Sequence, residues 1–153
     1  MKYGLIADIG GTNARFALAP IKSSRPLTLT VEDLIQVKTL NGADFESISL
    51  AIKAYLKSIS SEYGEINQGC LAIACPTEND WIAMTNHTWA FSVESLKSEL
   101  GFKTLAFIND YHALANSILF LGEQGAVQVG GGQSVSGKPK VVTGPGTGLG
   151  LGA

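Results

Sequence analysis

LIADIGGTNARFAL, residues 5–18, places the glycines Gly10 and Gly11 between two short apolar stretches. The stretches at 3–9 and 15–19 predict two strands, and the glycine pair predicts the tight turn of a hairpin between them. Glycine also lets a backbone turn sharply and come close to a phosphate group, whose oxygens accept hydrogen bonds from backbone N–H groups. The turn is therefore a candidate phosphate loop as well as a candidate hairpin turn.

The residues on either side of this turn favour the phosphate interpretation. Asp8 stands before the glycines and Thr12 follows them. A carboxylate would repel a phosphate unless Mg²⁺ lay between them, and proteins commonly hold Mg²⁺ with one or two carboxylates together with phosphate oxygens. Thr12 adds a hydroxyl donor. The alternative that these residues form a hairpin turn and nothing more stays open.

A second glycine turn follows an apolar stretch near the other end of the sequence. Residues 143–148 read TGPGTG, in which Thr147 stands between Gly146 and Gly148. This pattern predicts a second phosphate turn. Residues 148–153 also match the G-x-G-x-x-A dinucleotide fingerprint. That match is weak, because the helix and the acidic residue that the fingerprint requires would lie beyond the sequence.

A carboxylate stands at the end of a third apolar stretch, where Asn109 and Asp110 follow residues 105–108. Ligands of open α/β sheets bind at the carboxyl ends of the strands. Asp110 could there accept the proton of an attacking hydroxyl, while Asn109 holds that substrate by hydrogen bonds. Both residues are also good caps for a helix predicted at 111–121, and the two roles are compatible. Two phosphate turns and one carboxylate at a strand end indicate phosphoryl transfer.

The rest of the pattern predicts a mixed α/β sheet with flanking helices. Further strands are expected at 34–40, 70–75 and 141–142, helices at 44–63 (ended by Gly64) and from a Ser92 cap to Leu100, a polar loop at 77–89 and a linker at 130–137. The nearly continuous apolar run at 70–75 predicts a strand covered on both faces.

Composition restricts the class of protein. The chain of 153 residues has 45% hydrophobic residues, a net charge of −2 and a pI of about 5.6. These values are typical of a globular protein, and they give no general attraction to nucleic acid or to a membrane surface. Cys70 and Cys75 are expected to be buried on opposite faces of one strand and unable to bridge. We therefore expect a reduced, cytoplasmic protein.

Three further patterns are weaker. Residues 132–138 have the spacing of a Walker A loop, but Pro139 follows where Ser or Thr is needed, so we interpret them as a loop. His87 and His112 form no zinc pattern with the cysteines, and His112 is expected on a helix surface.

The two tryptophans, Trp81 and Trp89, are expected to be packing residues. An alternative stays open, because a polar loop that carries Asn86, His87, Thr88 and Trp89 could line a sugar pocket. Aromatic faces and amide donors suit sugars.

Five blocks of the sequence, in the right order, together resemble the bacterial-type glucokinases. They are LIADIGGTNARFAL (5–18), CLAIACP (70–76), MTNHTWAFS (84–92), FINDYHALA (107–115) and GPGTGLG (144–150). The resemblance implies an actin-like ATPase (ribonuclease H-like) fold, with ATP and Mg²⁺ as the phosphoryl donor. It also implies that glucose is phosphorylated on its 6-hydroxyl.

The resemblance assigns roles by position. The first phosphate loop would consist of Ala7, Asp8, Ile9, Gly10, Gly11 and Thr12, with Asp8 acting on Mg²⁺ through water, and the second phosphate turn would include Thr147 and Gly148. Asp110 would be the general base and a substrate ligand, and Asn109 would bind a sugar hydroxyl.

Members of this family continue well beyond residue 153. The continuation contributes further sugar ligands (a glutamate and a Glu-Gly-Gly-His segment), the adenosine pocket and a final helix that packs on the small domain. We therefore expect residues 1–122 to form the small actin-like domain. Residues 123–153 would be a linker and the first strands of a truncated large domain. The chain alone should phosphorylate glucose poorly.

Rival functions remain. A kinase for another hexose, or a non-catalytic sugar-binding regulator of the same fold, would share most of these features. A nicotinamide-dependent oxidoreductase is disfavoured, because the first glycine turn leads into a strand instead of a helix. No nucleic-acid or membrane partner is expected, and a homodimer is left open.

Overall fold

The computed structural model describes residues 1–21, 30–59, 61–121, 125–133, 135, 137–145 and 149–152. The chain divides into two compact units, Met1–Asp110 and Tyr111–Ala153. The sequence placed the domain boundary after residue 122, and that boundary stays a prediction.

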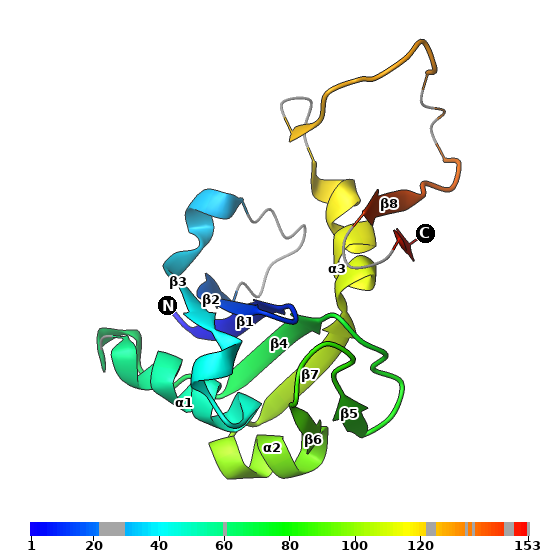
Figure 1. Cartoon of the computed structure of the whole chain (residues 1–153). Coiled ribbons are helices and arrows are strands. Elements are labelled where there is room, and N and C mark those ends of the chain that lie inside the picture. The colour runs from blue at the N-terminus through cyan, green and yellow to red at the C-terminus, as the bar shows by residue number, and fades with distance from the viewer. Residues whose placement is uncertain are drawn as a thin grey trace. The chain divides into compact units, whose positions relative to one another are not determined.

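Groups of strands are separated by single α-helices along the chain (Figure 1). The strands are β1 (Tyr3–Ile9), β2 (Asn13–Pro20), β3 (Ile35–Asn41), β4 (Gln68–Ile73), β5 (Trp81–Ala83), β6 (Ala90–Ser92), β7 (Thr104–Asn109), β8 (Val142–Pro145) and β9 (Leu149–Gly152). The α-helices are α1 (Ile48–Ser58), α2 (Val93–Leu100) and α3 (Asp110–Ser117). Short 3₁₀ helices lie at Val31–Asp33, Gly42–Asp44, Ser61–Tyr63 and Ile118–Phe120.

A five-stranded mixed sheet forms the first unit, in the order β3-β2-β1-β4-β7. The pairs β1–β2 and β2–β3 are antiparallel, whereas β4 and β7 extend the sheet in parallel with β1. The predicted hairpin is confirmed, since Ile9 pairs with Ala14 across the glycine turn. The parallel strands need crossover connections, and α1 and α2 lie on those connections.

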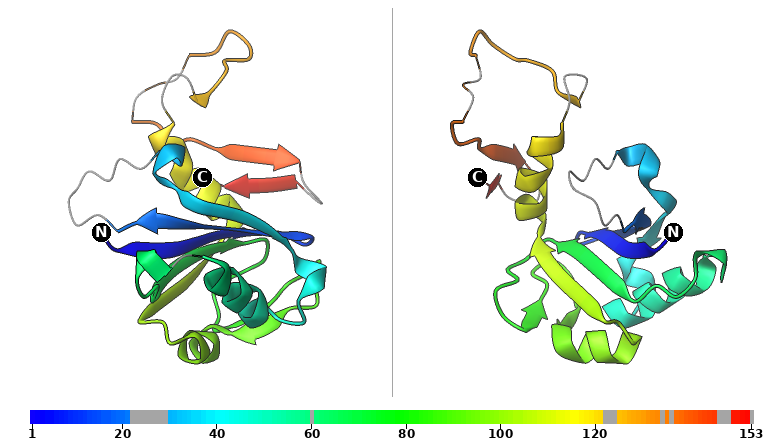
Figure 2. Two further views of the ribbon diagram at one scale, coloured as in Figure 1. Left: turned by 90° about the vertical axis from the view of Figure 1, so that its left-hand side faces the viewer. Right: turned by 180° about the vertical axis from the view of Figure 1, so that it is seen from behind.

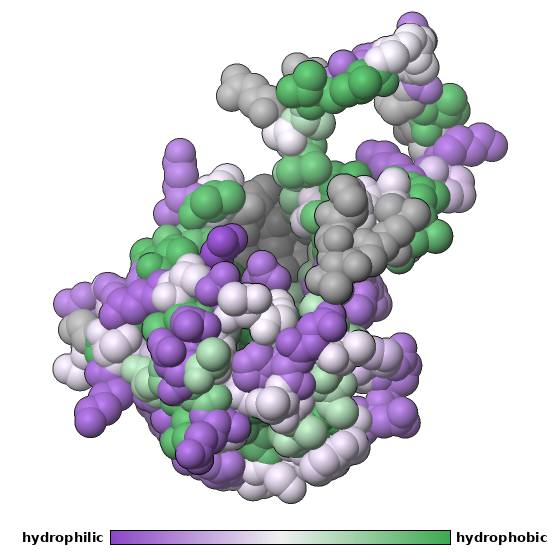
Figure 3. All heavy atoms as spheres, in the orientation of Figure 1, coloured by the Kyte–Doolittle hydropathy of each residue, from purple (hydrophilic) through white to green (hydrophobic). Residues whose placement is uncertain are grey.

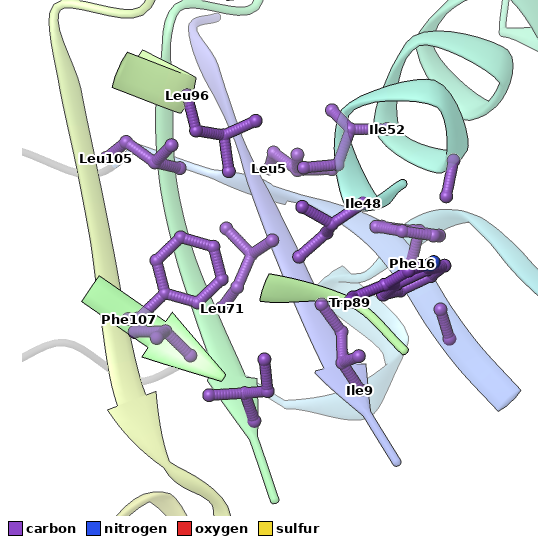
Figure 4. Close-up of a cluster of buried hydrophobic side chains, with 14 of the residues drawn as sticks. Leu5, Ile9, Phe16, Ile48, Ile52, Leu71, Trp89, Leu96, Leu105 and Phe107 are labelled. Carbon is purple, nitrogen blue, oxygen red and sulfur yellow. The ribbon is translucent and has the colours of Figure 1, made fainter. Parts of the chain in front are cut away.

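Both crossover helices pack on the same face of the sheet (Figure 2). Side chains from β1, β2, β4 and β7 that point to this face meet those of the helices in one cluster (Figure 4). Its largest fully buried members include Tyr55 on α1 and Phe16 on β2, whose rings stack with centroids 5.1 Å apart. Full burial of one such side chain contributes roughly 1.5–3 kcal/mol, so this layer is the main source of stability.

The first helix is shorter than the sequence predicted. Instead of one helix over 44–63, a 3₁₀ turn ends at Asp44, α1 covers Ile48–Ser58, and a second 3₁₀ turn follows. The reason lies in Ser47, whose side chain accepts the N–H of Leu50 and so starts the helix there. Gly64, expected to end the long helix, has a left-handed φ of 70° and instead closes the second 3₁₀ turn.

The second helix agrees with its prediction. The side chain of Ser92 accepts the N–H of Ser95, and Glu94 stands in the first turn of α2. Gly101 ends the helix in the left-handed conformation, and its N–H returns to the carbonyls of Lys97 and Ser98.

Two expectations about the sheet and its connections were wrong. Within the described residues, the face of the strand at 70–75 that carries Leu71 and Ile73 is buried, whereas on the opposite face Cys70 is exposed and Ala72 is only half-buried. Cys75 is buried as expected, and both cysteines are free thiols. The stretch at 77–89, predicted as a loop, contributes β5 and pairs it with β6 in a small antiparallel hairpin.

The second unit contains α3 and the antiparallel hairpin β8–β9. The helix predicted at 111–121 ends at Ser117 and continues as a 3₁₀ turn. His112 is exposed on α3, as expected. The described residues at 126–133 and 137–141 form neither strand nor helix, which agrees with the loop interpretation of the Walker-like spacing. None of the described helices combines the length and the apolar character needed to cross a bilayer.

Candidate active site

The parallel strands of the first unit end in one row. Ile9 of β1 lies opposite Ile73 of β4, and Ile73 lies opposite Asn109 of β7. Neighbouring strands are about 4.8 Å apart, so the end of β1 and the end of β7 are separated by about 10 Å. The glycine turn and the pair Asn109-Asp110 therefore follow the same edge of the sheet. The structure brings together two of the three groups that the sequence singled out.

The backbone N–H groups of the glycine turn differ in whether they have a hydrogen-bond acceptor. The N–H of Gly10 donates to the carbonyl of Asn13 at 2.9 Å and closes the turn. The carbonyl of Thr12 accepts the N–H of Gly42 at 2.8 Å. The N–H groups of Gly11 and Thr12 have no acceptor among the residues that the structure describes. Two adjacent donors in a glycine turn are an arrangement that binds an anion.

Asp8 stands two residues before Gly10, and its side chain is exposed. Within the described ranges, no three His, Cys, Asp or Glu side chains gather into a cluster that could hold a metal ion. A single exposed carboxylate beside free backbone donors fits Mg²⁺, which needs only one or two carboxylates when phosphate oxygens supply further ligands.

Arg15 is a neighbour of Asp8 that the sequence pattern did not single out. In the hairpin register Arg15 lies directly opposite Asp8 on the adjacent strand, and its side chain is also exposed. Residues in such a pair project from the same face of the sheet. The signal was present in the sequence, because both residues are equally distant from the hairpin turn.

Asn109 and Asp110 occupy the junction of β7 and α3. The side-chain amide of Asn109 donates to the carbonyl of Cys75 at 3.3 Å. Asp110 is half-buried. Burial raises the pKa of the Cys75 thiol, and the negative charge of Asp110 raises this pKa further. The carboxyl group of Asp110 therefore lies within electrostatic reach of Cys75.

The segment after β4 links the two parts of the row, and sequence reasoning did not find this role. The N–H of Ala74 donates to the carbonyl of Ile9 at 3.1 Å, directly before the glycine turn. Cys75 follows, and its own carbonyl accepts from Asn109. Nothing in the local sequence pattern indicates these contacts, since they join residues far apart in the chain.

The second predicted phosphate turn cannot be placed, because Thr147 and Gly148 lie outside the described residues. The strands that flank them pair with Pro145 opposite Leu149. Residues 149–152 form β9 instead of entering a helix, so the weak dinucleotide fingerprint is wrong. At Gly150 the ring of Tyr111 fills the space that a Cβ would need.

The tryptophans and the stretch around them have separate roles. Trp89 is 2% exposed and packs in the core, as predicted, whereas Trp81 is 63% exposed and is not a packing residue. Asn86 and Thr88 are exposed, while His87 is half-buried with its ring 4.3 Å from that of Trp89. The buried ring of Trp89 presents no open face to a sugar, which contradicts that part of the sugar-pocket alternative.

Comparison with known proteins gives a consistent result. The family model described as Glucokinase matches residues 5–153. The glucokinase of Salmonella typhi is 46% identical over 151 residues, which cover 98% of this chain and 43% of that protein. The glucokinase of Salmonella arizonae is 45% identical over 150 residues with the same coverage. The chain thus spans less than half the length of the curated relatives it matches.

Solved structures agree with the sequence relatives. A glucokinase from an Antarctic psychrotroph superposes with a TM-score of 0.81 at 34% identity, covering 99% of this chain and 45% of that one. A ROK family glucokinase from Streptomyces griseus, solved with glucose and AMPPNP, gives a TM-score of 0.60 at 17% identity, covering 97% and 43%. That second likeness shows the fold alone. The expected actin-like ATPase fold is confirmed.

Proposed function

The chain belongs to the glucokinase family, and on this premise we propose that it forms part of an enzyme that transfers a phosphoryl group from ATP to the 6-hydroxyl of glucose. The observation that carries the proposal is the row formed by Ile9, Ile73 and Asn109. It sets a turn, whose N–H groups at Gly11 and Thr12 have no acceptor within the described part of the chain, and a half-buried carboxylate along one edge of the sheet. A phosphate donor and a hydroxyl acceptor can then bind side by side.

The reaction needs a base, and we assign this role to Asp110. The 6-oxygen of glucose attacks the γ-phosphorus, the new O–P bond forms as the bond to the β–γ bridging oxygen breaks, and ADP leaves. The carboxylate of Asp110 accepts the hydroxyl proton. Asn109 binds a sugar hydroxyl, and its hydrogen bond to the carbonyl of Cys75 fixes the orientation of its amide.

The phosphates are assigned to the stretch Ala7–Thr12, with the N–H groups of Gly11 and Thr12 as donors. Asp8 would hold Mg²⁺ through water, and the ion would neutralise charge on the phosphate oxygens. Thr147 and Gly148 are proposed as a second phosphate turn on the basis of their sequence alone.

The remaining parts of the site are proposed to lie in additional sequence. The chain covers 43% of the curated relatives' length, so we propose that further sugar ligands and the adenosine pocket belong to the remainder that such relatives have. The 153 residues alone should then turn over glucose poorly, because part of the surface that positions the substrates is missing. The two free thiols support a reducing, cytoplasmic location. A homodimer remains a prediction.

The test is a coupled assay of sugar phosphorylation with ATP and Mg²⁺, on the full-length protein that contains this chain. We expect glucose-dependent turnover that falls by about 10²-fold or more in Asp110→Asn. Asp80→Asn is the matched control, since Asp80 accepts the N–H of Glu94 and lies outside the row. Turnover with a different hexose and not with glucose would show that the proposed substrate is wrong and the proposed reaction class is right. A folded full-length protein with no turnover of any hexose would favour a non-catalytic sugar- or nucleotide-binding member of the same fold.

A further inference from the structure

The stretch Asn86–Trp89, which the proposed reaction does not use, is anchored in the core at its carboxyl end. Trp89 is 2% exposed, and its indole N–H donates to the carbonyl of Phe45 at 2.9 Å. Its own carbonyl accepts the N–H of Met84 at 3.0 Å. The residues just before Trp89 are therefore held by a buried side chain, although Asn86 and Thr88 themselves are exposed.

His87 lies between the buried Trp89 and the 3₁₀ turn that begins at Gly42, and it contacts both. Its ring packs on Trp89 with centroids 4.3 Å apart, and its Nδ1 accepts the backbone N–H of Trp89 at 3.3 Å. The opposite nitrogen faces Gly42, where a Cβ would lie 2.8 Å from Nε2. Gly42 is thus a glycine because His87 occupies the space that a side chain would need.

Gly42 itself is hydrogen-bonded to the glycine turn. Its N–H donates to the carbonyl of Thr12 at 2.8 Å. Asn86 contacts the same turn directly, since a Cβ at Gly11 would lie 3.0 Å from both the Cβ and the carbonyl oxygen of Asn86. By contrast, a Cβ at Gly10 would have only the carbonyl of Asn13, at 3.8 Å, within 4 Å. The turn is therefore packed against the stretch Asn86–Trp89 on one side and open at Gly10.

We infer that His87 and Asn86 are positioning residues, which hold the backbone donors of Gly11 and Thr12 in place for the phosphates of ATP. The inference rests on the proposed function. A glycine turn is intrinsically flexible, and binding by backbone donors weakens when their geometry is loose. The contacts through Gly42 and Asn86 remove that freedom before the nucleotide arrives, so the loss of entropy on ordering the turn does not weaken binding.

The main experiment compares His87→Ala with Tyr63→Ala in the full-length protein that contains this chain. Tyr63 is a suitable control, because it is also a half-buried ring packed on another ring, that of Tyr3, at the opposite end of β1 from the glycine turn. We expect His87→Ala to raise the KM for ATP by about ten-fold or more and to change the KM for glucose by less than about two-fold. Tyr63→Ala should change neither KM.

A second measurement tests the contact between His87 and Gly42 without an activity assay. Amide hydrogen exchange of the 153-residue chain should be faster at Gly42 in His87→Ala and unchanged there in Tyr63→Ala, because only the first variant loosens the bond to Thr12. Gly42→Ala, which pushes His87 away from the opposite side, should raise the KM for ATP in the same way.

The outcomes separate the two proposals. Unchanged exchange at Gly42 in His87→Ala, or equal increases in the KM values for ATP and glucose, would overturn the positioning role while leaving the kinase assignment intact. An unmutated full-length protein that neither binds nor uses ATP would overturn the proposed function, and the positioning role with it.

Discussion

The two units, residues 1–110 and residues 111–153, differ in whether their apolar side chains are buried. Every buried member of the hydrophobic core belongs to the first unit. Among the described residues of the second unit, none is buried, and Val127 and Val129 are 89% and 94% exposed. Figure 3 shows apolar side chains on the surface of α3 and of the segment that follows it.

The difference shows that apolar content does not by itself make a core. In the first unit, a sheet of five strands offers one apolar face, and α1 and α2 cover it. The second unit has one α-helix and one two-stranded hairpin among its described residues. A two-stranded hairpin is marginally stable in water, because it has too little surface to bury. The proposed base and the first phosphate loop thus stand on the part of the chain with a core.

The largest expected effect is a difference between the two units in how much unfolding free energy is lost when an apolar side chain is truncated. Phe16→Ala should cost about 3–5 kcal/mol of unfolding free energy, because Phe16 is fully buried against Tyr55. Val129→Ala should change this free energy by less than about 0.5 kcal/mol. Urea unfolding followed by circular dichroism measures both. A cost at Val129 comparable with that at Phe16 would show that the second unit also shares in a core.

A smaller effect concerns a buried hydroxyl in the first unit. Tyr55 donates to the carbonyl of Gln36 at 3.0 Å, so Tyr55→Phe should cost about 1–3 kcal/mol at neutral pH. Burial, with a smaller contribution from Tyr63, raises the pKa of Tyr55 from 10.0 to about 12. The folded state therefore holds this proton more tightly, and the resulting stability is present below pH 10 and is lost as the pH approaches 12.

The measurement is urea unfolding of the unmutated chain and of Tyr55→Phe between pH 8 and pH 12. The free-energy gap between them should narrow above pH 10, because only the unmutated chain must take up this proton on folding at high pH. A constant gap across that interval would contradict the link between burial and the pKa.

The smallest effect should appear in the second unit. The hydroxyl of Tyr111 donates to the carbonyl of Gly144 at 2.6 Å and so ties β8 to the start of α3. Tyr111→Phe should cost about 0.5–1.5 kcal/mol locally. Amide exchange should then become faster in β8 and β9 and stay unchanged in β1 and β4. Equal acceleration in both units would show that they unfold together.

Much of the first unit could be predicted from local pattern. The hairpin around the glycine turn, the strand before Asn109 and the Ser92 cap all follow from residues close together in the sequence. The long helix expected at 44–63 was wrong, because the apolar spacing of Phe45 continues that of α1 although Ser47 starts the helix later. The incomplete burial of the second face of β4 among the described residues was also missed, since a continuous apolar run does not say whether a second layer is present.

The candidate site divides in the same way. Asp8, Gly10, Gly11 and Asp110 were chosen from residue type and from position at strand ends, and the sheet does place them along one edge. The amide of Asn109 on Cys75 could not be predicted, since it joins residues 34 positions apart. Arg15 could have been found from the hairpin register alone.

The sequence by itself determined the hairpin around the glycine turn, the strand that ends in Asn109 and the carboxylate that follows it, because propensity, apolar period and turn chemistry act over a few residues. Only the tertiary structure decided which residues surround the glycine turn. Gly11 and Gly42 are confined by Asn86 and His87, which approach them from more than forty positions along the chain. Such contacts depend on where the packed core places each loop, and the sequence close to each glycine does not specify that placement.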